Sequence, residues 1–195
     1  MKNFFLLSIA LLLIGMTACK DSTDDMGWEI SPDSKSQAIE KEIDGIAFKF
    51  CLLNEQGKPA TVFNEGENFI FSFSVENNLK DSISIPTQFI NDGFYRVYEK
   101  SNNIDMGKAW TGTWCNFSNE KMIIELLPDE QKELNCPWRL SEIFQPDYPL
   151  CKGEDMNPLP SGEYFTSLHF DFLYTIEGKQ KSIKNTVLKI NFKIQ

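Results

Sequence analysis

The sequence predicts an all-β protein, a two-sheet sandwich of about eight strands, with a closed β-barrel as the alternative. From Gly45 onward, apolar and polar residues alternate with a period of two, the pattern of strands with one buried face. Phenylalanine occurs 16 times, and bulky aromatic residues suit pleated, half-buried surfaces. No long segment has helical periodicity, and turn signals divide the apolar runs. Period two is common to sandwiches and barrels, so it leaves that choice open.

The expected strands follow one another with turn signals between them. The clearest alternation in the first half runs from Phe69 to Val75, and Asn77-Asn78 ends it as a turn. Shorter strands stop at Pro86 and at Pro128-Asp129. The segment 131–138 is expected to be the hairpin partner of the strand before it. The expected strands are residues 48–53, 69–75, 83–85, 94–98, 122–126, 131–138, 164–176 and 188–194.

The last two strands give the strongest structural prediction. Alternate residues from Tyr164 to Ile176 are apolar or small, and the residues between them include Ser167, His169 and Asp171. A Glu177-Gly178-Lys179 turn follows, and the alternation returns from Leu188 to Ile194. This pattern predicts a β-hairpin with an apolar inner face.

The N-terminus predicts export and lipid attachment. Met1-Lys2 precedes an apolar run from Phe4 to Ile14, which matches a secretory signal and is too short for a transmembrane helix of roughly 20 residues. The following Met16-Thr17-Ala18-Cys19 resembles the bacterial lipoprotein signal, with methionine where leucine is more usual. This resemblance implies cleavage before Cys19 and acylation of that residue, which holds the protein to a membrane.

The chain is therefore divided into three parts. Residues 1–18 are expected to be the signal peptide, residues 19–44 the lipid anchor and a flexible tether, and residues 45–195 the β-sandwich domain. A short helix is considered within the tether at 37–43. The acidic stretch 20–25 resembles the surface-export signal of Bacteroidetes lipoproteins, and a plain solvated linker is an equal alternative. We expect an outer membrane lipoprotein of the cell envelope, exposed at the cell surface if that signal operates.

The order of motifs in the domain is similar to the immunoglobulin-like domain of BsuPI-type proteinase inhibitors. The motifs that carry the likeness are Val75-Glu76-Asn77, Phe94-Tyr95-Arg96-Val97, Leu127-Pro128-Asp129-Glu130 and Pro160-Ser161-Gly162-Glu163-Tyr164. The resemblance implies an immunoglobulin-like sandwich, and it suggests proteinase inhibition as an alternative function. The stretch from Ser101 to Phe117 has no counterpart in that pattern.

The cysteines predict disulfide bonds. With Cys19 used for lipid, Cys51, Cys115, Cys136 and Cys151 remain, an even number in an exported protein. We expect at least one bridge among the last three, which lie near apparent loops. Zinc is the alternative reading, but the chain has no Cys-x-x-Cys pair and a single histidine, so no metal site is predicted.

The sequence predicts neither an active site nor a cofactor. His169 and Asp171 share the polar face of one strand, but no nucleophile is marked by an elbow motif. A net charge of −9 excludes nucleic acid as a favourable partner, because the phosphate backbone would be repelled. The chain is therefore expected to be non-enzymatic.

Aromatic residues in two long loops are the candidates for ligand binding. These are Trp110, Trp114, Trp138 and Tyr148. Indoles on loops form platforms that stack on sugars or anchor protein interfaces; in the alternative, they cap the core beneath the loops. The leading hypothesis is a membrane-anchored binding or accessory module for a glycan or another envelope protein, with a proteinase inhibitor as the alternative.

Overall fold

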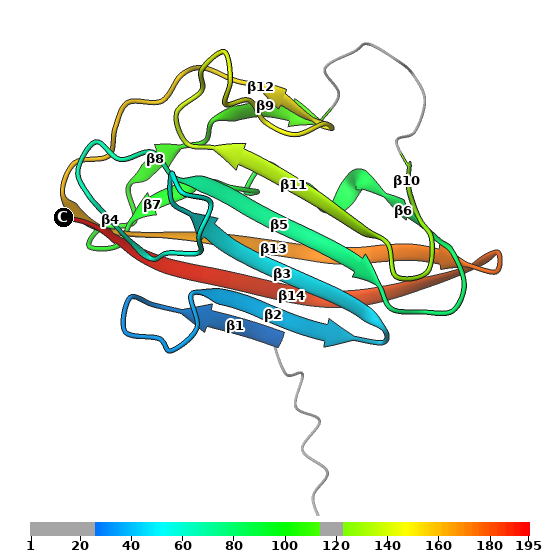
Figure 1. The fold of residues 1–195 in the computed structure, drawn as a ribbon. Helices are drawn as coiled ribbons and strands as arrows, with labels where there is room; N and C mark the ends of the chain where they lie inside the picture. The colour runs from blue at the N-terminus through cyan, green and yellow to red at the C-terminus, as the bar shows by residue number, and fades with distance from the viewer. Residues whose placement is uncertain (1–25, 114–122) are drawn as a thin grey trace, which may run out of the picture.

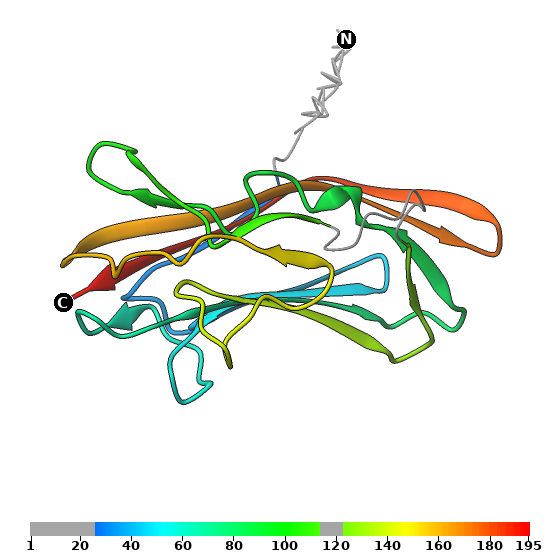
Figure 2. The same cartoon turned by 90° about the horizontal axis from the view of Figure 1, so that it is seen from above.

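The chain folds as an immunoglobulin-like two-sheet β-sandwich, as predicted. The computed structural model describes residues 26–113 and 123–195. Two layers of strands pack face to face in Figures 1 and 2, and within these residues they do not close into a barrel. The alternative fold is therefore set aside.

The larger sheet has the order β1-β14-β13-β6-β10, with β4 beside β14 and the β7–β8 pair beside β13. Its strands are β1 (Met26–Ile30), β4 (Val62–Phe63), β6 (Ile83–Pro86), β7 (Val97–Glu99), β8 (Asp105–Gly107), β10 (Ile123–Leu126), β13 (Gly162–Ile176) and β14 (Lys179–Ile194). A 3-10 turn, η1 (Thr87–Phe89), follows β6.

The smaller sheet has the order β11-β5-β3-β2. Its strands are β2 (Ala38–Ile43), β3 (Ile46–Leu53), β5 (Ile70–Asn77) and β11 (Gln131–Pro137). A separate two-stranded sheet joins β9 (Trp110–Thr113) to β12 (Leu150–Lys152). The six strands that the sequence did not predict are β1, β2, β4, β8, β9 and β12; most are too short to show alternation.

Aromatic side chains from the two sheets meet in the core. Phe48 of β3 lies edge-on to Phe172 of β13, with 5.0 Å between ring centroids. Phe73 of β5 lies 5.8 Å from Phe170 of β13 in a similar geometry. All four rings are buried. The alternation read from the sequence therefore places the phenylalanines of both sheets on facing inner surfaces.

The final hairpin is confirmed. β13 and β14 pair over almost their whole length, with a turn at Glu177-Gly178, where both residues have positive φ (49° and 72°). A register shift between Phe170 and Phe172 allows Ile183 and Thr186 both to be buried on the inner face. Such a bulge restores the phase of the alternation.

Two predictions about the N-terminal part are wrong. The helix considered at 37–43 is instead strand β2, because Ile39 pairs with Phe50 and is buried in the core. The tether, predicted to reach residue 44, is shorter because β1 pairs in parallel with β14 from Met26 onward. The sandwich therefore includes residues well before Gly45.

Two further details of the predicted topology are also corrected. The segment 131–138 is not the hairpin partner of 122–126, because β11 pairs with β5 in one sheet and β10 with β6 in the other. The strand predicted at 94–98 is reduced to β7, which begins only at Val97. The first residues of the predicted strand belong to a turn, in which Tyr95 has a positive φ of 59°. Across the described ranges, no helix has the length and apolarity needed to cross a bilayer.

Candidate functional site

The predicted tryptophan platform does not form from Trp110 and Trp138. Their side chains are 3% and 2% exposed. The indole nitrogen of Trp110 donates to the Phe94 carbonyl at 2.6 Å, and that of Trp138 to the Asn157 carbonyl at 2.9 Å. Both indoles cap the core, as the alternative reading expected. Tyr148 is 53% exposed; Trp114 lies outside the described residues, as does Cys19.

The cysteine prediction is wrong for two of the four residues. Cys51 and Cys136 are both buried, free thiols. In the strand register, Cys51 lies opposite Ser72 of β5 and Cys136 lies opposite Phe71 of β5. Because Phe71 and Ser72 are consecutive, the two cysteine side chains point to opposite faces of the smaller sheet and cannot meet. Burial raises the pKa of Cys136 to about 12. Cys151 lies in β12; Cys115 is outside the described residues, so a bridge between these two stays a prediction.

A groove crosses the outer face of the larger sheet along β13. It consists of two adjoining hollows of about 460 and 360 Å³ that share Asn91 and His169. We call it the β13 groove. The first hollow includes Gln88, Asp171 and Asn185 among its lining residues, and the second includes Tyr98, Asn103, Phe165 and Ser167.

An aromatic pair lines one end of the groove. Tyr98 of β7 and Phe165 of β13 are direct cross-strand partners, and their rings stack with centroids 5.2 Å apart and an interplanar angle of 20°. The ammonium group of Lys189 lies 5.2 Å from the Phe165 ring centroid and is paired with Glu29 at 3.1 Å. The pKa of Glu29 is held below its usual value, mainly by a hydrogen bond from Asn191 and further by Lys189, although burial acts in the opposite direction.

Polar groups at the other end are open to a ligand. The side-chain amides of Gln88 and Asn185 make no hydrogen bond with any described residue, and His169 is exposed. Asp171 accepts one hydrogen bond, from the Asn185 backbone at 2.9 Å. The Ser167 hydroxyl lies at the aromatic end instead, where it is buried and has no partner in the described part of the chain. Amides, a carboxylate and an imidazole together can both donate and accept hydrogen bonds.

The wall of the groove is fixed by Asn91. Its side-chain oxygen accepts from the Gly93 backbone at 2.9 Å, and its side-chain nitrogen donates to the His169 carbonyl at 2.6 Å. Both ends of this amide are therefore committed to backbone, one within the 91–93 turn and one on β13. Asn91 positions the wall and is not itself a free ligand-binding group.

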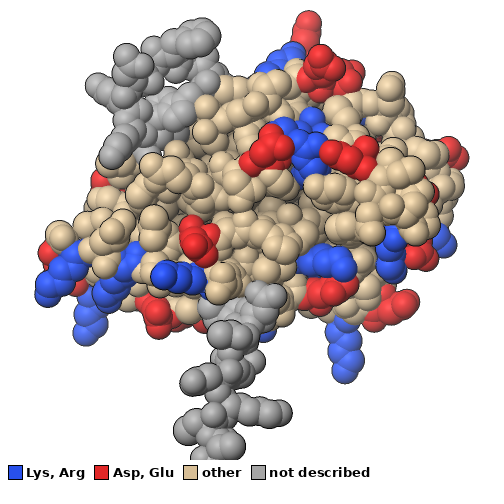
Figure 3. All heavy atoms as spheres, turned by 180° about the vertical axis from the view of Figure 1, so that it is seen from behind, with Lys and Arg blue, Asp and Glu red and all other residues tan. Residues whose placement is uncertain are grey.

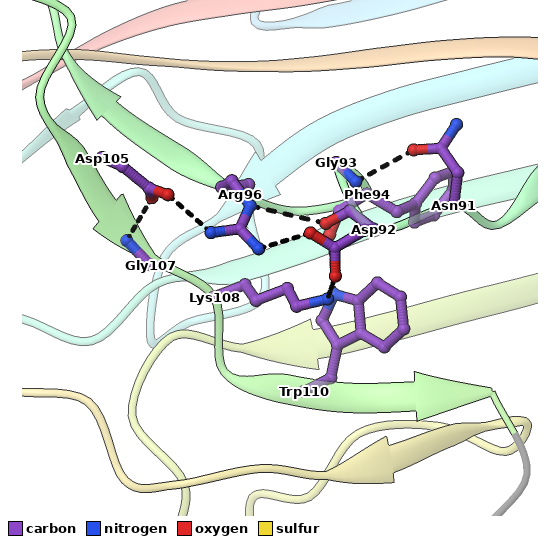
Figure 4. Close-up of polar contacts among 9 residues, drawn as sticks. All are labelled: Asn91, Asp92, Gly93, Phe94, Arg96, Asp105, Gly107, Lys108 and Trp110. Atoms are coloured by element: carbon purple, nitrogen blue, oxygen red, sulfur yellow. Dashed lines mark hydrogen bonds and ion pairs between the residues drawn. The ribbon is translucent and has the colours of Figure 1, made fainter.

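Behind that wall lies a network of charges, shown in Figure 4. Asp92 accepts from Arg96 at 2.6 Å and also from Lys108, and Arg96 makes a second ion pair with Asp105 at 2.6 Å. The Lys108 ammonium lies 4.0 Å from the Trp110 ring centroid. Lys108 holds the pKa of Asp92 below its usual value. The network ties the turn at residues 91–96 to β8 and β9.

This groove was not predicted from the sequence, although one signal was present. Phe165 is an aromatic residue on the face of β13 that also carries Ser167, His169 and Asp171. Among the described residues, no group of three or more His, Cys, Asp or Glu side chains gathers as a metal site. The arrangement suits the binding of a polar ligand with one apolar face.

Comparisons with known proteins add little to this geometry. No family model matches the chain, and no curated protein matches it. A solved structure with some similarity is that of the CooA pilin subunit from enterotoxigenic Escherichia coli, at 10% sequence identity. The match covers 75% of this chain and 98% of that chain with a TM-score of 0.31, which is too low to support an argument about function.

Proposed function

We propose that this chain is a lipid-anchored, non-enzymatic binding module of the bacterial envelope and that its β13 groove binds a glycan. The observation that carries the proposal is that the stacked rings of Tyr98 and Phe165 lie on the same sheet face as polar side chains that are free to bind a ligand. Sugars have apolar C–H faces and hydroxyl groups that donate and accept hydrogen bonds. An aromatic surface beside amides and a carboxylate matches both features.

The groove also has the rigidity that weak polar binding requires. Its floor is β13, which is paired on both sides over part of its length, with β14 and with β7. Its wall is held by Asn91 and the Asp92 network. A preformed site loses less conformational entropy on binding than a mobile loop does.

Glycan-array binding followed by calorimetry tests the proposal. We expect Tyr98→Ala to weaken binding about tenfold, which corresponds to roughly 1.4 kcal/mol. Tyr148→Ala is the matched control, because it removes an exposed tyrosine that does not line the groove. Binding to no glycan, or equal binding by the two variants, would refute the proposal. Intact mass of the mature protein tests acylation at Cys19 separately.

One loop favours proteinase inhibition as a second candidate function. Within residues 141–147, Ile143 is 84% exposed and Phe144 is 41% exposed. The loop is held at both ends: Arg139 and Asn68 exchange hydrogen bonds of 2.9 and 3.0 Å, and Asp147 contacts the Asn135 backbone at 2.7 and 2.9 Å. A fixed loop with an exposed apolar tip has the form that enters a protease cleft.

A panel of serine proteases distinguishes this second function from the first. If the loop inhibits, Ile143→Asp should abolish inhibition, because a buried carboxylate in an apolar cleft is costly. Tyr98→Ala should leave inhibition unchanged. Absence of inhibition across the panel, or inhibition that Ile143→Asp does not alter, removes this candidate.

A further inference from the structure

We infer that the lysine-bearing edge of β14 faces a membrane surface with anionic lipid headgroups. We call this surface the β14 lysine edge, formed by Lys179, Lys181 and Lys184. The inference rests on the lipid anchor proposed above, and it gives the sandwich a preferred orientation on the bilayer.

The edge is free of strand pairing. β1 pairs with residues 186–190 of β14, and β4 pairs with Lys193 and Ile194. Residues 179–183 pair with β13 on one side, and Lys184 and Asn185 lie at the register shift. No described strand pairs with residues 179–185 on the other side. The backbone and side chains along this stretch are therefore accessible to a flat partner.

The charge of the edge is opposite to that of the protein as a whole. All three lysines are exposed, and none forms an ion pair with a described carboxylate. Figure 3 shows Lys and Arg side chains gathered at the end of the molecule that carries the β13–β14 hairpin. With a net charge of −9 for the chain, an anionic surface would attract this edge and repel much of the remainder.

The edge also lies within reach of the anchor. β1 runs parallel to β14 and begins with Met26 beside Thr186, so the chain enters the fold at the end of β1 that is next to Lys184. Only residues 20–25 separate Cys19 from Met26. Seven steps of extended backbone span at most about 25 Å. An acylated Cys19 would therefore keep the lysines near the headgroups, where each contributes to attraction.

Lysine footprinting on vesicles tests the inference with the full acylated chain. The protein is placed in vesicles of phosphatidylcholine alone or of phosphatidylcholine with phosphatidylglycerol, and a membrane-impermeant reagent acylates exposed amines. We expect Lys179, Lys181 and Lys184 to be labelled roughly fivefold more slowly on the anionic vesicles, with the difference lost in high salt. Lys58 and Lys152 are the controls, because both are exposed and neither belongs to the hairpin. Lys58 lies between β3 and β4, and Lys152 lies in β12.

The outcomes separate this inference from the proposed function. Loss of vesicle association in high salt would mean that the chain lacks its lipid anchor. Stable association with equal labelling of the three lysines on both vesicle types would overturn the orientation alone. The lysines would then serve only to keep an unpaired strand edge from joining other strands.

Discussion

Tyr95 and Cys136 are two titratable side chains that stay uncharged in the core, and each lies against a backbone carbonyl. Tyr95 is fully buried between the sheets and donates its hydroxyl to the Leu134 carbonyl at 2.5 Å. Burial raises its pKa well above the usual value. Cys136 is buried nearby and its thiol approaches the Pro137 carbonyl at 3.7 Å. Burial stabilises the neutral form of each group because the charged form would lose its hydration.

This environment predicts the reactivity of the two free thiols. We expect Cys51 and Cys136 to resist an alkylating reagent near neutral pH in the folded protein and to react after unfolding, because both are buried and the pKa of each is raised. Peptide mass spectrometry without reduction measures both states. Rapid labelling of either residue in the folded protein, or a disulfide to either, would contradict the structure.

The same burial predicts a loss of stability at alkaline pH. The folded pKa of Cys136 is about 12 against an ordinary 9.0, so the unfolded chain releases this proton first. The contribution of the neutral thiol is complete below pH 9 and is lost as the pH rises toward 12. We expect the Cys136→Ala variant to show a smaller fall in the free energy of unfolding across this range, measured by urea titration at each pH.

At the scale of elements, the β13–β14 hairpin determines the shape of the larger sheet. Its two-residue turn has positive φ at both Glu177 and Gly178, the conformation that matches the right-handed twist of the flanking strands. The outer face of β13 forms the groove floor, and the outer edge of β14 carries the lysines. The register set at this turn therefore positions both proposed surfaces.

Substitution of Gly178 tests how much the turn contributes. Gly178→Ala should destabilise the protein by about 1–2 kcal/mol, because a Cβ disfavours the left-handed conformation, although no atom lies within 4 Å of the added group. Gly112→Ala is the matched control: it also has open space, but it lacks a positive φ. Equal stability of the two variants in denaturant titrations would show that the turn conformation is not a constraint.

At the scale of the whole molecule, one aromatic seam joins the two sheets. Phe73 of the smaller sheet contacts Phe170 of the larger sheet, and also Phe89 and Phe94 of the segment that leads to the groove wall. Ring contacts of this kind each add about 0.5–1.5 kcal/mol beyond the burial of apolar area. The core and the groove wall are thus parts of one packed unit.

Truncation of Phe73 should therefore affect both stability and the groove. We expect Phe73→Ala to lower the free energy of unfolding by about 3–5 kcal/mol, and Phe144→Ala, which removes a 41% exposed ring, to change it by less than about 1 kcal/mol. Thermal or denaturant unfolding measures both. A small effect of Phe73→Ala would mean that the sheets do not depend on this seam.

The sequence predicted the inner faces of the long strands because side-chain direction alternates locally along any strand. Phe71 and Phe73 of β5 and Leu168 and Phe170 of β13 could be assigned to the core without knowledge of their partners. β1 and β2 show too little of this pattern to be predicted. They become strands because β14 and β3 offer them free edges.

Sequence alone thus determined the fold class and the final hairpin, and the export signal stays a prediction. All three were read from neighbouring residues. Tertiary structure decided which surfaces are available. Trp110 and Trp138 are buried because distant segments cover them, and the groove exists because β7 lies beside β13, more than sixty residues later in the chain. Burial and proximity of this kind depend on how non-local segments pack, which no local pattern specifies.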